Sequence, residues 1–174
     1  GKTVISKTDF FMNTTPIAYI VFNRPQHTEK SFNVLRKYKP NKLFIIADGP
    51  RNNHPTDVAR CDLVRKIVKK VDWNCEVSYN FSDINLGLKR RVSSGIDWVF
   101  ESVDRAIILE DDCIPNEDFF RFCGNLLEYY KNNSQICVIT GNNFQRGISR
   151  NTYSYYFSKL DLKGVIDIKT SKID

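Results

Sequence analysis

Several features that define common protein classes are missing from this chain of 174 residues. No apolar run approaches the roughly 18 residues of a membrane-spanning helix. Neither the phosphate-binding loop Gly-x-x-x-x-Gly-Lys-Ser/Thr nor the nucleophile elbow Gly-x-Ser-x-Gly occurs. The two histidines and five cysteines lack the close pairing that zinc sites use. These absences argue against an integral membrane protein, a P-loop nucleotide hydrolase, a serine hydrolase and a zinc protein.

The charge balance is basic, with 26 Lys and Arg against 20 Asp and Glu and a formal charge of +6. Such a balance favours anionic partners: nucleic acid, an anionic membrane surface or a phosphorylated small molecule. Because the chain has neither a long basic tract nor an aromatic RNA-binding signature, we do not expect it to bind nucleic acid. Scattered cysteines, odd in number, favour reduced thiols and a cytoplasmic protein, with peripheral association at the inner face of the membrane left open. The abundant lysine, asparagine and isoleucine suggest a bacterial source.

Short apolar runs alternate with helical patterns along the chain. Buried strands are predicted at 16–22, 43–47, 77–81, 106–109 and 136–140, with helices that start after Thr28, Asp57, Gly87 and Asn116. This alternation is typical of βαβ units, so we expect one α/β domain with a Rossmann-like, mostly parallel sheet and helices on both faces. Residues 1–15 lack such a pattern and are interpreted as a flexible lead-in.

Three adjacent carboxylates, Glu110, Asp111 and Asp112, follow the apolar run 106–109 and precede Pro115. Their mutual repulsion costs on the order of 1 kcal/mol per pair even in water, so a positive group is needed nearby. A divalent cation that carries a substrate phosphate meets this need, because Mg²⁺ and Mn²⁺ prefer oxygen ligands. A solvated acidic turn is the alternative that the tripeptide alone leaves open.

Parallel sheets bind ligands beyond the carboxyl ends of their strands. That rule places Arg24, Asp48 and Asp83, which each follow a predicted strand, on one rim with the three acids. Asp48 can accept a hydrogen bond from a base N–H, Gly49 would let a flat ring approach the backbone, and Arg24 can stack on a base or neutralise phosphate. An ordinary Asp-Gly-Pro turn and a surface arginine are the alternatives.

Lys89, Arg90 and Arg91 open a predicted helix against its dipole, at a cost of about 0.3–1 kcal/mol per exposed charge. A diphosphate would reverse the sign, because it accepts hydrogen bonds from the first N–H groups of the helix and from these side chains. If Leu88 and Val92 face the core, Arg90 points farthest from it, so Lys89 and Arg91 are the better ligands. A solvated basic turn is the alternative.

Four segments of the chain follow the order of a known family. They are PIAYIVFNRP at 16–25, KLFIIADGPR at 42–51, NLGLKRRVSSGIDWVFE at 85–101 and RAIILEDDCIPNEDFF at 105–120. Together they resemble the nucleotide-sugar transferases of GT-A fold, in particular the group similar to N-acetylglucosaminyltransferase I. The last segment looks like that family's acidic metal-binding motif, a strand that ends in Glu-Asp-Asp. By this resemblance, residues 16–158 form a GT-A nucleotide-sugar (donor)-binding domain.

The resemblance implies a metal-dependent glycosyltransferase that transfers a sugar, most simply from a UDP-sugar, to a hydroxyl of a glycan or lipid-linked acceptor, as in polysaccharide biosynthesis. Asp112 would bind Mn²⁺ or Mg²⁺, and Glu110 and Asp111 would contact ribose and sugar hydroxyls. Asp48 and Arg24 would hold uracil. The remaining donor-site residues would be Gly49, Asp83, Lys89 and Arg91. Because side chains alternate along an extended strand, we expect Glu110 and Asp112 on one side and Asp111 on the other.

The resemblance weakens toward the carboxyl end. In the family, a strand like the one at 153–158 leads into a tryptophan-rich segment and an acceptor-binding half with the catalytic base. Here residues 159–174 diverge, and no tryptophan follows Trp98. We therefore expect an incomplete acceptor part without an identifiable base.

Two other functions compete with the transferase. The second hypothesis is a nucleotide-sugar-binding module that has lost catalysis. A phosphoryl-transfer or receiver-type domain is the third, because acids at strand ends also gather around Mg²⁺ in such domains. It is the weaker one, since Asn23 and Arg24, and no acid, follow the first strand.

Overall fold

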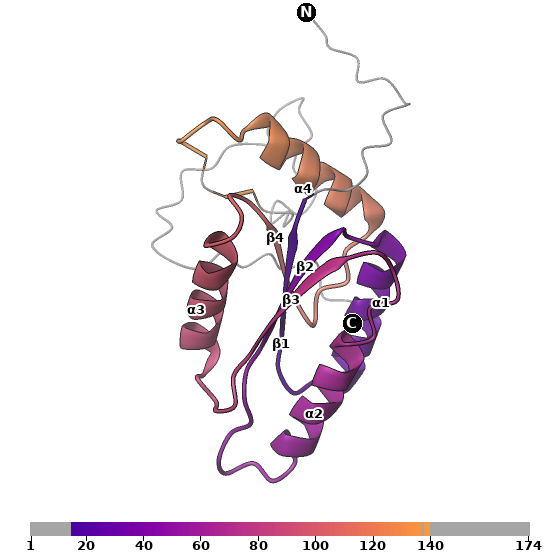
Figure 1. The fold of residues 1–174 in the computed structure, drawn as a ribbon, viewed down its shortest axis with the longest axis vertical. Helices are drawn as coiled ribbons and strands as arrows, with labels where there is room; N and C mark the ends of the chain where they lie inside the picture. Colours follow the sequence, from indigo (N-terminus) through magenta and orange to yellow (C-terminus); the bar gives the residue numbers. More distant parts are fainter. Residues whose placement is uncertain (1–14, 137, 140–174) are drawn as a thin grey trace, which may run out of the picture.

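Strands and helices alternate along the chain (Figure 1), which confirms the predicted order. The structure is a computed structural model that describes residues 15–136, 138 and 139. Its elements, in order, are β1 (Ile17–Val21), α1 (Pro25–Tyr38), β2 (Lys42–Ala47), α2 (Asp57–Val68), β3 (Glu76–Phe81), α3 (Leu88–Phe100), β4 (Ile107–Glu110) and α4 (Glu117–Tyr129).

The strands form one sheet in the order β3-β2-β1-β4, and all its strand pairs are parallel. Ile17 of β1 lies opposite Leu43 on one side and Ile107 on the other. The described residues are therefore an α/β domain with a Rossmann-like sheet. The chain runs outward from β1 to β3 and then returns to the other side of β1 for β4. Ligand sites of such sheets lie beside this reversal of strand order.

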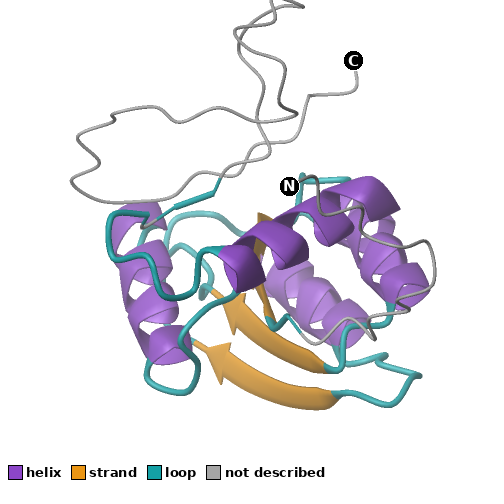
Figure 2. Cartoon of the chain, turned by 90° about the horizontal axis from the view of Figure 1, so that it is seen from above, coloured by secondary structure: helices purple, strands orange, loops and turns teal. Residues whose placement is uncertain are grey.

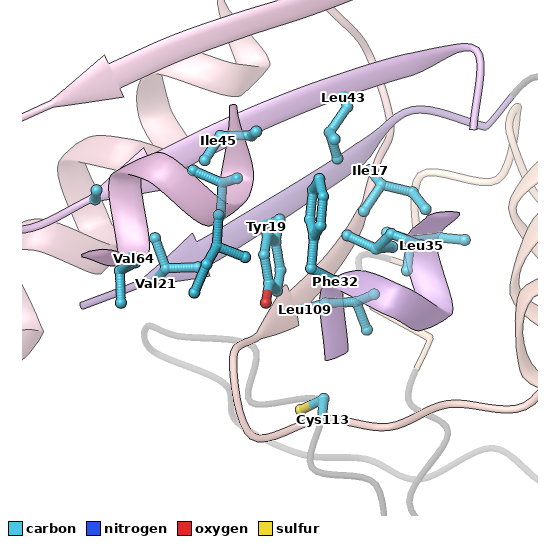
Figure 3. Packing of buried hydrophobic residues seen from close by; sticks show 14 of the residues in the cluster. Ile17, Tyr19, Val21, Phe32, Leu35, Leu43, Ile45, Val64, Leu109 and Cys113 are labelled. Atoms are coloured by element: carbon cyan, nitrogen blue, oxygen red, sulfur yellow. The ribbon is translucent and has the colours of Figure 1, made fainter. Parts of the chain in front are cut away.

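Helices cover both faces of the sheet, with α1 and α2 on one side and α3 on the other (Figures 1 and 2). Side chains of β1 point to the two faces in turn. Tyr19 and Val21 pack with residues of α1, α2 and α4, whereas Ala18 and Ile20 pack with α3. All of β1 is buried, which explains why its sequence is an unbroken apolar run. Figure 3 shows the first of these clusters, where the rings of Tyr19 and Phe32 stack with centroids 6.4 Å apart.

The first helix begins at Pro25 rather than after Thr28. Proline suits the first helical position, because its φ is that of a helix and an N–H there would have no partner. Arg24 is the capping residue, and both the N–H and Oγ1 of Thr28 donate to the Arg24 carbonyl at 2.9 Å. The predicted Thr28 cap was wrong, because Pro25 determines where the helix starts.

The third helix packs on the sheet as predicted at Val92 but not at Leu88. Its buried side includes Val92, Gly95 and Val99, whereas Leu88 is 76% exposed. Gly95 permits this contact, because a Cβ at that position would lie 2.7 Å from Cγ2 of Ile46. The assumption that Leu88 faces the core was therefore wrong.

Some predictions fall where the structure gives no description. Ile136, Val138 and Ile139 belong to no strand, and positions 137 and 140 of the predicted fifth strand lie outside the described residues. Residues 1–14 of the lead-in, the strand at 153–158 and the tail at 159–174 lie outside them as well. Across the described ranges, no helix has both the length and the apolar character needed to cross a membrane.

Candidate functional site

A cavity of about 260 Å³ lies at the carboxyl edge of the sheet, beside the reversal of strand order. It is bounded by the ends of β1 and β4, the loop after β2 and the start of α3. Five residues predicted from the sequence line it together: Arg24, Asp48, Arg91, Glu110 and Asp111. The other lining residues are Ile20, Val21, Phe22, Arg51, Asn85, Gly87, Leu88 and Val92.

The three acids after β4 have different environments. Glu110 is the last residue of β4 and lines the cavity, and the next two residues form a turn. Asp111 is buried and also lines the cavity, whereas Asp112 is exposed and does not. The predicted alternation, with Glu110 and Asp112 on one side, was wrong because the extended backbone ends before Asp111.

Arg24 offsets part of the negative charge of this acidic turn. Its Nη2 donates to Asp111 Oδ1, and its Nη1 donates to Asp112 Oδ2 at 3.2 Å. Burial alone would lower the pKa of Arg24, but the charges of the two aspartates raise it above its ordinary value. The positive group that the sequence calls for is thus supplied by the protein itself.

Asp111 is held through its main chain as well as its side chain. Its carbonyl accepts from Ser31 Oγ at 2.8 Å, and that hydroxyl lies 2.6 Å from the buried hydroxyl of Tyr19. Burial raises the pKa of Asp111, and the charge of Arg24 opposes this shift. The second carboxylate oxygen, Oδ2, is buried without a hydrogen-bond partner among the described residues. Buried acceptors of this kind are uncommon, and a ligand donor or a cation would satisfy it.

Asp48 organises the loop that precedes α3. Its Oδ1 accepts from the N–H groups of Gly49 and Leu86, both at 2.9 Å. Its Oδ2 accepts from Gly87 N–H and Asn85 Nδ2, both at 3.1 Å. Two oxygens of a carboxylate offer about four acceptor positions, so protein donors use the full capacity of Asp48. A base N–H, as the sequence suggested, would have to displace one of them.

Two further predicted residues lie beside the cavity without lining it. A Cβ on Gly49 would be 2.5 Å from the carbonyl carbon and oxygen of Ile84, so the close approach at this glycine is to the protein's own backbone. Asp83 is exposed on the loop after β3. Neither position is brought to the cavity wall by the fold.

The cations at the start of α3 separate into one buried and two exposed side chains. Arg91 is 5% exposed and lines the cavity, whereas Lys89 and Arg90 are exposed and do not. Arg91 donates to the carbonyl and, at 2.8 Å, to Oδ1 of Asn80, but its Nε has no partner among the described residues. Burial lowers the pKa of Arg91, and the charge of Asp48 opposes this shift without forming an ion pair with the guanidinium. A buried cation of this kind suits an anionic ligand.

Four residues of the site were not predicted from the sequence. Arg51 lines the cavity and is bound to the buried Asp57, while its Cζ lies 5.6 Å from the centroid of the Phe22 ring. Asn85 lines it too and is oriented by Asp48. The signal for Arg51 was its place in the loop after a predicted strand, the rule that selected Arg24 and Asp48, whereas Phe22 is the last residue of the first predicted strand. Nothing in the sequence links Asp57 to Arg51, because that contact depends on the course of the loop before α2.

A divalent cation at the acidic turn would have few protein ligands. Within the described ranges, no three His, Cys, Asp or Glu side chains are grouped so that they could hold a metal. Mg²⁺ and Mn²⁺ can bind through one or two carboxylates together with substrate phosphates. The side chain of Asp112, which is 40% exposed, and the unpartnered Oδ2 of Asp111 fit such a site. These two carboxylates could hold such a cation only together with ligands from another molecule.

A larger cavity, of about 380 Å³, lies between the end of α3, β4 and α4. None of the residues predicted to bind a donor or a metal lines it. It is bordered by Val138 and Ile139, next to positions that the structure does not describe. The smaller cavity is therefore the candidate site.

Comparison with known proteins adds no family. No family model matches the chain, and no curated protein matches it either.

Proposed function

We propose that this chain is a metal-dependent glycosyltransferase domain of GT-A fold that uses a nucleotide-diphosphate sugar, most simply a UDP-sugar, as its donor. One observation carries the proposal: Glu110 and Asp111, at the end of β4, line the same cavity as the buried Arg91 at the start of α3, at the reversal of strand order. In a metal-bound diphosphate, the negative oxygens would contact the start of α3 and the cation would contact the acids.

The diphosphate would lie against the start of α3. Arg91 would donate through its unpartnered Nε, and the first N–H groups of the helix would add hydrogen bonds. Lys89, exposed two residues earlier, would reach the phosphates only from the solvent side. The loop that Asp48 holds places Gly87 at the cavity wall, where its N–H donates to Asp48 and its carbonyl accepts from the N–H of Arg91.

The acidic turn would hold the cation, through Asp112 and the free oxygen of Asp111. When bound, such an ion acts as a Lewis acid and stabilises the departing diphosphate. Arg24 would then exchange one of its two carboxylate partners for a phosphate oxygen, while the cation balances the carboxylate that Arg24 releases. An acceptor hydroxyl of a glycan or lipid-linked substrate would attack the anomeric carbon, and we assign no described residue as its base.

Isothermal titration calorimetry with UDP, with and without Mn²⁺, tests the donor site. We expect binding that depends on the metal and that falls at least about ten-fold in Asp112→Ala. The matched control is Asp62→Ala, which removes an exposed acid from α2 and leaves UDP binding unchanged. Equal binding by wild type and Asp112→Ala, with or without metal, would contradict the proposal.

A second assay separates a transferase from an inactive binding module. The protein is incubated with a panel of UDP-sugars and Mn²⁺, and release of free sugar or UDP is measured. Release above the level of Asp112→Ala supports a transferase. Tight metal-dependent UDP binding without release or transfer favours the module.

A further inference from the structure

The two residues that the sequence suggested for base recognition, Asp48 and Arg24, already have protein partners. Asp48 uses both carboxylate oxygens within the loop before α3, and Arg24 is bound to Asp111 and Asp112. If the cavity takes a nucleotide, other groups have to contact its base. This inference therefore rests on the proposed function and extends it to the part of the ligand beyond the diphosphate.

Arg51 is a fixed hydrogen-bond donor at the cavity wall. Asp57, which is 1% exposed, accepts from its Nε at 2.6 Å and from its Nη2 at 3.0 Å, and Asn23 Nδ2 supports the same carboxylate at 2.8 Å. The guanidinium also lies over the Phe22 ring. Of its five N–H groups Asp57 takes two, which leaves about three for a ligand. Asp57 thus fixes the orientation of Arg51 before any ligand arrives.

Asn85 lines the same cavity from the loop before α3, and its amide is fixed in orientation. Its Nδ2 donates to Asp48 Oδ2 at 3.1 Å and to the Gly49 carbonyl at 2.9 Å. Both partners only accept, so the amide cannot be reversed without placing oxygen against oxygen. Its Oδ1 is therefore directed away from Asp48 and can accept a hydrogen bond from a ligand.

The charges assign these groups to the neutral part of the ligand. The ion pair of Arg51 and Asp57 has no net charge, so its free edge suits an uncharged carbonyl. Arg91 has no carboxylate partner among the described residues, and it suits the diphosphate. The cavity thus has charged groups at the start of α3 and at the ends of β1 and β4, and a pair without net charge at the loop after β2.

We propose that Arg51 and Asn85 determine base specificity, with Arg51 donating to a ring carbonyl and Asn85 Oδ1 accepting from the adjacent ring N–H. An imide, as in uracil or thymine, has a carbonyl on each side of its N–H, so it meets both groups whichever side Arg51 occupies. Cytosine lacks the N–H, and adenine lacks the carbonyl. Guanine has a carbonyl on one side of its N–H and an amine donor on the other, so it meets both groups in only one orientation. The preferred ligand class is therefore an imide-bearing pyrimidine nucleotide, and GDP is its strongest competitor.

Calorimetry with the full chain and Mn²⁺ tests this assignment, with UDP, CDP, GDP and pyrophosphate as probes. Wild type should bind UDP at least about ten-fold more tightly than CDP or GDP. In Arg51→Gln the UDP affinity should fall about ten- to hundred-fold, the range for a lost charged hydrogen bond. The ratio of UDP to CDP affinity should approach one, while pyrophosphate binding stays within about a factor of two of wild type.

Two further variants keep the test decisive. Arg51→Lys retains a counter-ion for Asp57, so it folds even if Arg51→Gln does not, yet it loses the planar fork and should lose base selectivity. Arg36→Gln removes an arginine that is also paired with an aspartate, Asp72, but that lies away from the cavity, and it should bind like wild type. Urea unfolding of each variant verifies that it is folded.

The outcomes separate this inference from the proposed function. If pyrophosphate and every nucleotide fail to bind, the proposed function is wrong. If nucleotides and pyrophosphate bind but wild type prefers CDP or GDP, or does not discriminate, the base assignment is overturned and the diphosphate site stands. An unchanged ratio of UDP to CDP affinity in folded Arg51→Lys also overturns it.

Discussion

Replacement of Asp48 by asparagine tests whether this residue holds the loop before α3 together. In the structure its carboxylate is 5% exposed and accepts four hydrogen bonds at 2.9 to 3.1 Å. Asp48→Asn replaces one carboxylate oxygen by an NH₂ group. Because that group donates and cannot accept, the two hydrogen bonds that the oxygen accepted are lost. Each lost bond to a charged acceptor is worth about 1.5–3 kcal/mol, so the loss is about 3–6 kcal/mol.

Urea denaturation of the protein without ligand measures this loss. A decrease of about 4 kcal/mol, with a slope of about 2 kcal/mol per molar urea, lowers the midpoint by about 2 M. This is a large share of the roughly 5–15 kcal/mol that stabilises a typical domain. The matched control is Asp72→Asn, whose partner Arg36 lies 3.2 Å away and whose side chain is 64% exposed, and it should cost less than about 1 kcal/mol.

If Asp48 serves only to contact a base, Asp48→Asn unfolds at the wild-type urea midpoint, and its only defect is in nucleotide binding.

The structure also predicts the effects of two substitutions and the reactivity of two buried thiols. Gly49→Ala places a Cβ 2.5 Å from the Ile84 carbonyl, so the loop must shift, and urea unfolding should show a free energy of unfolding lower by about 1–3 kcal/mol. An unchanged free energy of unfolding would show that the loop can shift without cost. Burial raises the pKa of Cys61 to about 11 and that of Cys123 to about 12, so both thiols stay protonated at neutral pH. Because an unfolded thiol has a pKa of about 8.5, the native state keeps its protons longer, and its stability falls as the pH rises from about 8.5 toward these values. Mass spectrometry after iodoacetamide treatment near pH 8 should find both unmodified until urea is added, and rapid labelling of the native protein would contradict their burial. Arg91→Met removes a buried cation that forms no ion pair, so the thermal midpoint of unfolding should stay the same or rise. Calorimetry should show at least about a ten-fold loss of pyrophosphate affinity. A loss of stability with unchanged pyrophosphate binding would instead make Arg91 a structural residue.

Much of the candidate site was accessible from the sequence, because it depends on a topological rule. Arg24, Asp48 and the acids from Glu110 onward each follow an apolar run, and parallel strands bring their carboxyl ends to one edge. The rule locates main-chain positions, but it does not give the direction of a side chain. That is why Arg91 reaches the cavity wall while Lys89 does not.

Hydrogen-bond partners were the part that the sequence left undetermined. Arg24 meets Asp111 and Asp112, which lie more than eighty positions along the chain, through contacts made only after β4 pairs with β1. Arg51 meets Asp57 because the loop between β2 and α2 turns back on itself. A single sequence contains no measure of such distances.

For the acidic turn, the sequence determined where the carboxylates lie along the chain, and the tertiary structure determined their surroundings. By itself, the sequence determined that strands and helices alternate, that the sheet is parallel and that three carboxylates follow the apolar run of its fourth strand, since these follow from the periodicity of apolar residues. Tertiary structure alone decided that Asp111 is buried, that Asp112 is exposed and that Arg24 pairs with both. The physical reason is that burial and ion pairing depend on which surfaces meet when the layers pack, and that is a property of the whole fold.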